Sequence, residues 1–269
     1  MSERPSGTGL LFAAAGTTCP EAMGAFDRIS QAAATRFPGV VLKWAYTSSG
    51  VRRKLIAQGR PIQDPREALA TLEAEGVTQC AVLSLHLSDG MEFGELAETV
   101  AAFAERKSSL ARLTLGRPIL TSEQDAARVF AALRAPLPHA PVEDEAVVFV
   151  AHGSTEPAAV RTLQAAVSLC RRIDRRLFLG MMLGAPSLEN VLQECKSASV
   201  KKAWLVPLMI AAGYSARDDI AGAGAGTWKS RFEAAGILCS PVLKGLGDNE
   251  AVVDIWMDHA DELLKRLKA

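Results

Sequence analysis

The sequence predicts an α/β fold made of two Rossmann-like parallel-sheet halves that are related by duplication. Short apolar runs typical of strands alternate with segments of helical periodicity, and this alternation predicts parallel strands joined by helices. The alternation occurs twice along the 269 residues, with four strands in each half. The predicted strands are, in order, Gly9–Ala15, Val40–Tyr46, Cys80–His86, Arg112–Leu115, Ala146–His152, Leu177–Leu183, Ala203–Ile210 and Leu238–Leu243.

Two pairs of segments carry the internal repeat. Leu10–Pro20 aligns without gaps with Val147–Pro157, and Val77–Gly90 aligns with Val200–Gly213. Duplicated domains usually pack about a pseudo-two-fold axis, and the ligands of open parallel sheets bind beyond the carboxyl ends of the strands. We therefore expect the functional residues to follow the strands, in a cleft between the two halves.

The segments between the strands predict the helices and the domain boundary. Ala135–Glu145 contains three prolines, which break the helical pattern, and is the predicted linker between domains 1–135 and 146–269. A long closing helix, Asn249–Lys268, has an apolar face wide enough to pack across both halves. The other predicted helices are Glu21–Phe37, Arg66–Glu75, Glu92–Lys107, Pro157–Ile173 and Ser187–Lys196.

The composition limits the class of partner. Lys and Arg together number 30, as do Asp and Glu, so the formal net charge is zero. This balance argues against a nucleic acid or an anionic membrane as partner. The five cysteines form no Cys-x-x-Cys pair, which favours reduced thiols over a zinc site or disulfides. No stretch resembles a signal peptide or is long enough to span a bilayer, so a cytoplasmic protein is expected.

Two histidines stand at predicted strand ends. His152 has Ala15 as its repeat partner, so the fold does not require an imidazole there. Its side chain is interpreted as a metal ligand or general base, the alternative being a strand-end histidine with a satisfied hydrogen bond. His86 has Met209 as its partner. Because its neighbours are apolar, a core histidine is the stronger interpretation there and a functional one the alternative.

A carboxylate and a basic cluster are further candidates. Glu92 follows the Asp89-Gly90 turn at a helix start, where a carboxylate caps the helix N-terminus or serves as a cleft base. Arg52-Arg53-Lys54 comes shortly after Thr47-Ser48-Ser49-Gly50, and guanidinium groups beside hydroxyls suit a ligand with several carboxylates. A solvated helix face is an equal alternative. Residues 221–226 alternate Ala and Gly and predict a loop or lid rather than a phosphate loop.

Motifs spread over nearly the whole chain resemble those of the single-chain (class II) anaerobic cobaltochelatases. That family inserts Co(II) into sirohydrochlorin in early-insertion cobalamin synthesis and is similar in architecture to ferrochelatase. The motifs are Gly-Thr-Thr-Cys-Pro-Glu (16–21), Thr-Ser-Ser-Gly-Val-Arg-Arg-Lys-Leu (47–55), Leu-His-Leu-Ser-Asp-Gly-Met-Glu-Phe (85–93), Ala-His-Gly-Ser-Thr (151–155), Gly-Ala-Pro-Ser-Leu-Glu-Asn-Val (184–191), Val-Pro-Leu-Met-Ile-Ala-Ala-Gly (206–213), Thr-Trp-Lys-Ser (227–230) and Leu-Lys-Gly-Leu-Gly-Asp-Asn (243–249).

The resemblance implies a lyase that inserts a divalent metal into sirohydrochlorin or a close relative. Co(II) is the expected metal, with Fe(II) and Ni(II) as alternatives. The metal is then a substrate, no organic cofactor is implied, and a homo-oligomer is left open. Two other functions remain: a non-catalytic tetrapyrrole- or haem-binding paralogue with His152 or His86 as axial ligand, and a structural partner in a chelatase hetero-oligomer.

The resemblance also implies a metal site that has lost ligands. The family holds its metal with a His after the fifth strand, a Glu before a Gly-Tyr-Pro-Ser turn and a His after the seventh strand. The first matches His152, whereas the other two fall on Leu183 and Ser215, so His152 is the expected metal ligand and catalytic residue. Glu92 is the second expected catalytic group. The expected substrate-binding residues are Thr17, Thr47, Ser48, Arg52, Arg53, His86, Ser154 and Ser215.

Overall fold

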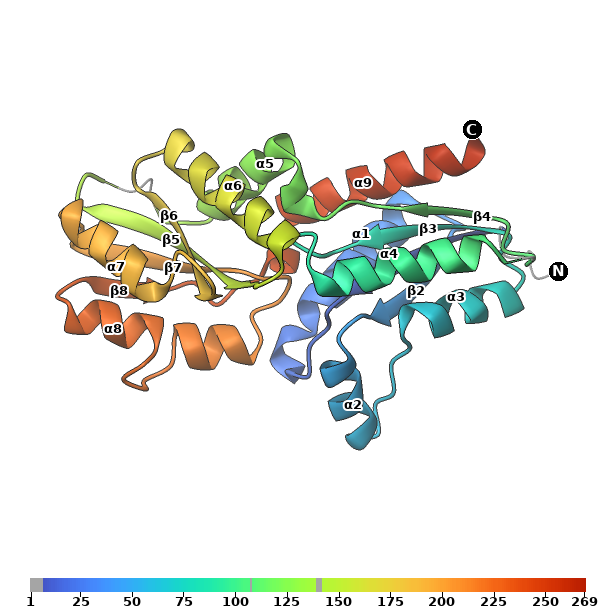
Figure 1. Ribbon diagram of the computed structural model, residues 1–269, viewed down its shortest axis with the longest axis horizontal. Helices are drawn as coiled ribbons and strands as arrows, with labels where there is room; N and C mark the ends of the chain where they lie inside the picture. Colours follow the sequence, from blue (N-terminus) through green and yellow to red (C-terminus); the bar gives the residue numbers. More distant parts are fainter. Residues whose placement is uncertain (1–6, 107, 139–141) are drawn as a thin grey trace. The chain divides into compact units, whose positions relative to one another are not determined.

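The computed structural model describes residues 7–106, 108–138 and 142–269 of the chain. These residues form two four-stranded sheets in which neighbouring strands run parallel, as the sequence predicts (Figure 1). The first sheet has the order β2-β1-β3-β4 and the second the order β6-β5-β7-β8. The strands are β1 (Thr8–Ala14), β2 (Val41–Tyr46), β3 (Gln79–Ser84), β4 (Arg112–Leu115), β5 (Glu145–Gly153), β6 (Leu177–Leu183), β7 (Lys202–Leu208) and β8 (Leu238–Pro241).

Helices follow the strands in both halves of the chain. The α-helices are α1 (Gly24–Arg36), α2 (Ser49–Ala57), α3 (Pro65–Ala74), α4 (Met91–Ala104), α5 (Glu123–Arg134), α6 (Pro157–Ile173), α7 (Leu188–Ser197), α8 (Trp228–Ala234) and α9 (Glu250–Lys268). Single turns of 3-10 helix, η1 (Pro20–Ala22), η2 (Ile119–Thr121) and η4 (Leu246–Asp248), and a π-helical turn, η3 (Ser215–Ile220), complete the set. The basic cluster at 52–54 lies on α2, and residues 221–226 form a loop, as predicted.

The hydrogen-bond register supports the duplication. Gly9 on β1 pairs with Cys80 on β3, and the repeat-equivalent residues Ala146 and Ala203 pair in the same way on β5 and β7. The strand orders of the two sheets are also the same when β1 is matched with β5, β2 with β6 and so on. The repeat in the sequence is therefore a repeat of the structure, and equivalent positions can be compared residue by residue.

The chain forms two compact units, and these units do not contain the same helices as the predicted domains. The first comprises the described part of Met1–Thr18, Asp27–Ile119 and Val253–Ala269, and the second comprises Cys19–Phe26 and the described part of Leu120–Val252. Helix α5, inside predicted domain 1–135, thus belongs to the second unit, and most of α9 belongs to the first. Of the predicted linker, residues 139–141 lie outside the described residues.

Side-chain contacts explain why α5 belongs to the second unit and most of α9 to the first. Phe130 of α5 packs on Phe149 of β5, with ring centroids 5.1 Å apart. In the first unit, Arg112 of β4 donates a hydrogen bond to the carbonyl oxygen of Leu267 in α9 (2.7 Å), and Arg36 of α1 forms an ion pair with Asp258 of α9 (2.8 Å). Packing of α9 across both halves stays a prediction.

The inner strands β1 and β5 are buried along nearly their whole length, which explains their continuous apolar runs. In the first unit, Leu11 and Ala13 belong to a core with Leu69 of α3 and Val100 of α4. Phe12, between them, stacks on Trp44 at a centroid distance of 4.7 Å. In the second unit, the corresponding core contains Val148 and Val150 of β5, Val191 and Leu192 of α7, and Trp228 and Phe232 of α8.

The state of the cysteines and the hydropathy of the helices can both be compared with what the sequence predicts. All five cysteines are free, and four of them are buried, so the prediction of five unpaired thiols is confirmed. Burial raises the pKa of Cys80 to about 12, as expected of a thiol that packs as a small apolar group. In the described part of the chain, no helix combines the length and apolar character needed to cross a membrane.

The turns after β1 and β5 both require glycine. Gly16 and Gly153 are equivalent in the repeat, and their φ angles are +90° and +85°. A Cβ on Gly153 would lie 1.9 Å from the carbonyl oxygen of Leu183, and a Cβ on Gly16 would lie 2.3 Å from the ring of Tyr46. A side chain would therefore meet both a strained backbone and an occupied space.

Substitution of Gly153 tests this requirement. We expect Gly153→Ala to lower the free energy of unfolding by about 3 kcal/mol or more, because strain and a clash with backbone coincide. Gly76→Ala, at φ +86° with open space around it, should cost about 1 kcal/mol. Gly226→Ala, with neither problem, should stay within about 0.5 kcal/mol of the parent. Urea unfolding measures all three, and equal losses at Gly153 and Gly76 would contradict the clash.

Candidate functional site

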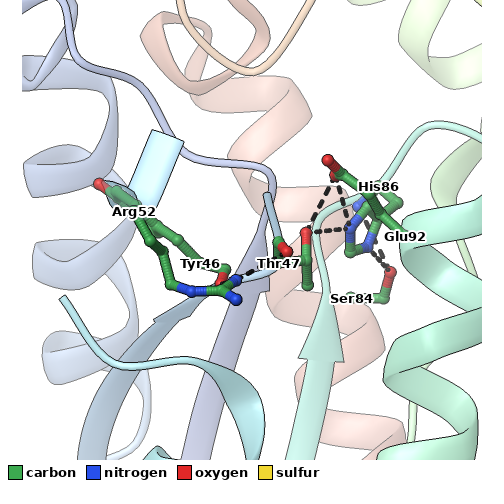
Figure 2. A network of polar contacts seen from close by, with 6 residues as sticks. All are labelled: Tyr46, Thr47, Arg52, Ser84, His86 and Glu92. Carbon is green, nitrogen blue, oxygen red and sulfur yellow. Dashed lines mark hydrogen bonds and ion pairs between the residues drawn. The ribbon is translucent and has the colours of Figure 1, made fainter. Parts of the chain in front are cut away.

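Four polar side chains of the first unit form one network at the carboxyl ends of β2 and β3 (Figure 2). Thr47 follows β2 directly, and Ser84 is the last residue of β3. His86 lies in the loop after β3, two residues beyond the end of the strand, where the prediction had the strand end at His86 itself. Glu92 is the second residue of α4.

The hydrogen bonds of this network have a direction. Nε2 of His86 lies 3.0 Å from Oγ1 of Thr47, whose hydroxyl donates to Oε2 of Glu92 over 3.0 Å. Because an ionised carboxylate can only accept, the Thr47 oxygen is left to accept a hydrogen bond from Nε2–H. Nδ1 of His86, 2.9 Å from Oγ of Ser84, then accepts from the Ser84 hydroxyl. We infer the Nε2–H tautomer of a neutral imidazole from this arrangement.

Burial keeps His86 neutral. Its side chain is 9% exposed, and the ring meets Phe93 edge-on at a centroid distance of 6.2 Å. Desolvation lowers the pKa of His86 to about 4, although Glu92 Oε2, 3.9 Å from Nε2, favours the charged form. The structure thus favours the core interpretation of this histidine. Both ring nitrogens of His86 are engaged within this network, and its expected roles in substrate binding and axial ligation stay predictions.

Thr47 is fixed through its backbone as well as its side chain. Its N–H donates to the carbonyl oxygen of Ala14 over 2.7 Å. Nη1 of Arg52 donates to the carbonyl oxygens of Tyr46 and Thr47 at 2.6 and 2.7 Å. Figure 2 shows the Arg52 guanidinium turned toward this end of β2. Arg52 therefore ties α2 to the strand end, a structural use that the expected substrate contact did not include.

Glu92 is held but not enclosed. Its side chain is 31% exposed, and the residue before α4, Gly90, provides no side-chain cap. The Glu92 carboxylate accepts from Thr47 rather than from the backbone of its own helix. This contact favours a carboxylate positioned for chemistry over one that only caps the helix. Its place in the first turn also suits a negative charge, because the helix dipole is positive there.

His152 lies at the end of β5 in the second unit. The strand runs one residue past it, to Gly153, and the imidazole is exposed. No residue in the described ranges hydrogen-bonds to its ring. Ser154, next in the turn, accepts a hydrogen bond from the N–H of Glu156 over 3.1 Å. The structure thus gives no support to a strand-end histidine with a satisfied ring.

The two positions expected to have lost a metal ligand also belong to the second unit. Leu183, the last residue of β6, pairs with Gly153 in the sheet and is 46% exposed. Ser215 is half-buried at the start of the π-helical turn. Across the residues that the structure describes, no group of three or more His, Cys, Asp or Glu side chains could hold a metal ion.

Comparison with known proteins places the chain in a family. The model of the cobalt chelatase (CbiK) family matches residues 8–265. The chain belongs to the cobalt chelatase family. This confirms the resemblance on which the expected function rests.

Named relatives match most of the chain as well. It is 39% identical over 251 residues to sirohydrochlorin cobaltochelatase CbiKC of Nitratidesulfovibrio vulgaris (strain Hildenborough), covering 93% of this chain and 88% of that protein. It is 33% identical over 222 residues to sirohydrochlorin cobaltochelatase of Salmonella typhimurium (strain LT2), covering 82% of each. Among solved structures, it is similar to the sirohydrochlorin chelatase SirB from Bacillus subtilis subspecies spizizenii in complex with cobalt, with a TM-score of 0.64, 15% identity and 97% of each chain covered. This last likeness confirms the chelatase fold.

Other expected site residues of this chelatase family member are partly accessible. Arg53 is exposed, and Thr17, Ser48 and Ser154 are half-buried, so their contact with a substrate stays a prediction. Ser84 is a member of the network that was not predicted from the sequence. Its signal was a lone hydroxyl in an apolar strand, two residues before His86 and therefore on the same side of the chain.

The neutral state of His86 predicts a pH-dependent stability. The unfolded His86 binds a proton below about pH 6.5, whereas the folded one stays neutral down to about pH 4. The unfolded state then takes up more protons in that window, so stability falls as the pH is lowered through it. Between pH 7.5 and 5, the wild type should lose about 2 kcal/mol more than His86→Gln. Chemical unfolding at both pH values measures this, and parallel losses in the two proteins would contradict it.

Proposed function

We propose that this protein is a sirohydrochlorin cobaltochelatase-type enzyme that inserts Co(II) into sirohydrochlorin or a close relative. The observation that carries the proposal is the 39% identity to a sirohydrochlorin cobaltochelatase over 93% of this chain. The family match over residues 8–265 supports it. The metal is a substrate, and Fe(II) and Ni(II) are alternatives to Co(II). A homo-oligomer stays a prediction.

Proton removal is the task proposed for Glu92. Metal insertion exchanges the N–H protons of the ring for one divalent cation, so a base that accepts them lowers the barrier. Glu92 suits this role because its carboxylate is partly exposed and is held on one oxygen by Thr47. His86 is a poor candidate for the same role, since it is buried and its pKa is near 4.

Presenting the metal is the task proposed for His152. Its exposed imidazole can bind Co(II) through one nitrogen, while Leu183 and Ser215 supply neither a carboxylate nor an imidazole nearby. Water then fills most of the coordination sphere, and the metal binds weakly. Weak binding suits a metal in transit, because Co(II) must leave the protein for the ring nitrogens.

The carboxylates of the tetrapyrrole need cationic and hydroxyl partners. Arg53 is exposed and can pair with a carboxylate through two N–H groups. Thr17, Ser48, Ser154 and Ser215 are half-buried and can donate hydroxyl hydrogen bonds. We propose these residues, rather than Arg52 and His86, as the substrate contacts.

One observation favours a second function. His152 is not accompanied by a Glu or His at Leu183 and Ser215, which fits a tetrapyrrole-binding protein that ligates an already metallated ring through His152. A haem titration distinguishes the two functions. Tight binding of haem that is lost in His152→Ala, without any acceleration of metal insertion by the wild type, would favour the tetrapyrrole-binding function over the enzymatic one.

Metallation of sirohydrochlorin tests the enzyme directly. Purified protein with sirohydrochlorin and Co(II) should accelerate the spectral change of metallation over the rate without protein. Fe(II) and Ni(II) in parallel reactions identify the preferred metal. No acceleration with any of the three metals would overturn the proposed activity.

Glu92→Gln tests the proposed base. The amide keeps the shape of the side chain and its acceptor oxygen for Thr47, but it cannot take up a proton. We expect a fall in kcat of about a hundredfold, within the usual range for a general base. Glu95→Gln is the matched control on the same helix, where the side chain is exposed, and it should leave kcat unchanged. Equal rates in the two variants would rule out Glu92 as the base.

Leu183→Glu tests the proposed weak metal site. Leu183 is the position on which the carboxylate of the family's metal site falls, and it is 46% exposed, so a Glu side chain is accommodated there without burial of its charge. We expect Co(II) to bind about tenfold tighter or more, corresponding to about 1.4 kcal/mol. Leu183→Gln controls for polarity without charge. Calorimetry measures the affinities, and an unchanged Co(II) affinity in Leu183→Glu would contradict the placement.

A further inference from the structure

We propose that His86 and Thr47 are positioning residues, which hold the Glu92 carboxylate in the orientation that its chemistry needs. Thr47 does so directly through its hydroxyl, and His86 does so by fixing which way that hydroxyl points. The inference rests on the proposed role of Glu92 in metal insertion. It gives Thr47 and His86 a function different from the substrate contact expected of them.

The direction of the hydrogen bonds explains how His86 can orient the Thr47 hydroxyl. Thr47 Oγ1 has one hydrogen to give, and two neighbours within 3.0 Å compete for it, His86 Nε2 and Glu92 Oε2. When Nε2 carries a proton, the Thr47 hydroxyl must point at Glu92; when Nε2 lacks one, the hydroxyl can turn to the ring and release the carboxylate. Ser84 fits the first arrangement, because its hydroxyl can donate to Nδ1, 2.9 Å away.

The backbone of both Thr47 and His86 is held in place by hydrogen bonds. The N–H of Thr47 is held by Ala14 of β1, and its carbonyl oxygen is held by Arg52. The backbone of His86 is held as well, since its carbonyl oxygen accepts from the N–H of Ile119 over 3.0 Å. A hydroxyl anchored in this way can fix a longer side chain such as Glu92, which has three rotatable bonds of its own.

The side chains of the network differ in how far they are exposed to solvent. His86 and Thr47 are 9% and 7% exposed, whereas the Glu92 side chain is 31% exposed. The network therefore has a buried end and an accessible end, and the accessible end is the carboxylate. No residue in the described ranges bonds to the other carboxylate oxygen, Oε1. One oxygen is held and the other can meet a proton donor.

The repeat shows that the fold does not need this network. The equivalents of Thr47 and His86 in the second unit are Met182 and Met209, according to the matched registers. Both methionines pack against the core of that unit. The same places can thus be filled by apolar side chains, so polar groups there in the first unit call for a functional explanation. The equivalent of Glu92 is Ser215, so the network occurs in the unit that keeps the carboxylate.

Kinetics of matched variants test the proposal. Thr47→Val keeps the branched shape but removes the hydroxyl, and we expect kcat for cobalt insertion to fall about tenfold to a hundredfold with little change in KM, as for a misplaced catalytic group. Thr47→Ser restores a hydroxyl and should recover most of this loss. Thr99→Val is the control on α4, because the Thr99 hydroxyl bonds only to the backbone of Glu95.

Variants of His86 follow the same logic. His86→Gln offers an amide N–H to Thr47 and should keep more of kcat than His86→Leu, which offers no donor. Nitrogen-15 NMR of the imidazoles, with His86 assigned by its absence in His86→Gln, should show the Nε2–H tautomer at pH 7. This readout does not depend on catalysis, so it tests the direction of the network even in an inactive variant.

The outcomes separate the two proposals. A wild type that does not accelerate metallation overturns the proposed function. An active wild type whose rate is unaffected by Thr47→Val overturns the positioning role. The positioning role is also overturned if Thr47→Ser is as slow as Thr47→Val, because the loss then comes from packing, or if His86 carries its proton on Nδ1.

Discussion

The first inner strand of each sheet, β1 or β5, is the constraint on which the rest of each unit depends. β1 and β5 are hydrogen-bonded to a parallel neighbour on each side and covered on both faces, so Leu10–Ala14 and Ala146–Val150 are buried completely. A strand in this position can neither slip nor twist independently, and the turn that follows it is placed with the same accuracy. That turn is closed by Gly16 in one unit and by Gly153 in the other, at φ angles that other residues avoid.

On this shared scaffold the two units have acquired different chemistry. The second unit has His152 where the first has Ala15, and the first has Glu92 where the second has Ser215. Around the carboxylate, Thr47 and His86 replace the methionines of the second unit with hydrogen-bonded polar groups. Buried polar groups are tolerated only when they are satisfied, and this network meets that condition through its own members. The duplication thus divides the proposed work, with the metal assigned to one unit and the protons to the other.

Much of the fold could be predicted from the sequence because a strand that is buried on both faces is a continuous apolar run, which is easy to recognise. Every predicted strand exists, and His152 and Glu92 were singled out by their places after strands and in the repeat. The exchange of α5 and α9 between units could not be predicted, since an amphipathic helix shows that it covers a core but not which core. The use of Arg52 for backbone carbonyls and of Ser84 for the His86 ring depends on tertiary contacts, which no spacing along the chain reveals.

The division of work between His152 and Glu92 is the central claim, and the Co(II) dependence of the insertion rate tests it most directly. Initial rates at saturating sirohydrochlorin would be measured over a range of Co(II) concentrations for the wild type, His152→Ala and Glu92→Gln. A metal-presenting His152 predicts that its loss raises the KM for Co(II), whereas the loss of a proton-accepting Glu92 lowers kcat and leaves that KM near the wild-type value. If both variants raise the KM for Co(II) alike, or if His152→Ala leaves it unchanged, the account is contradicted.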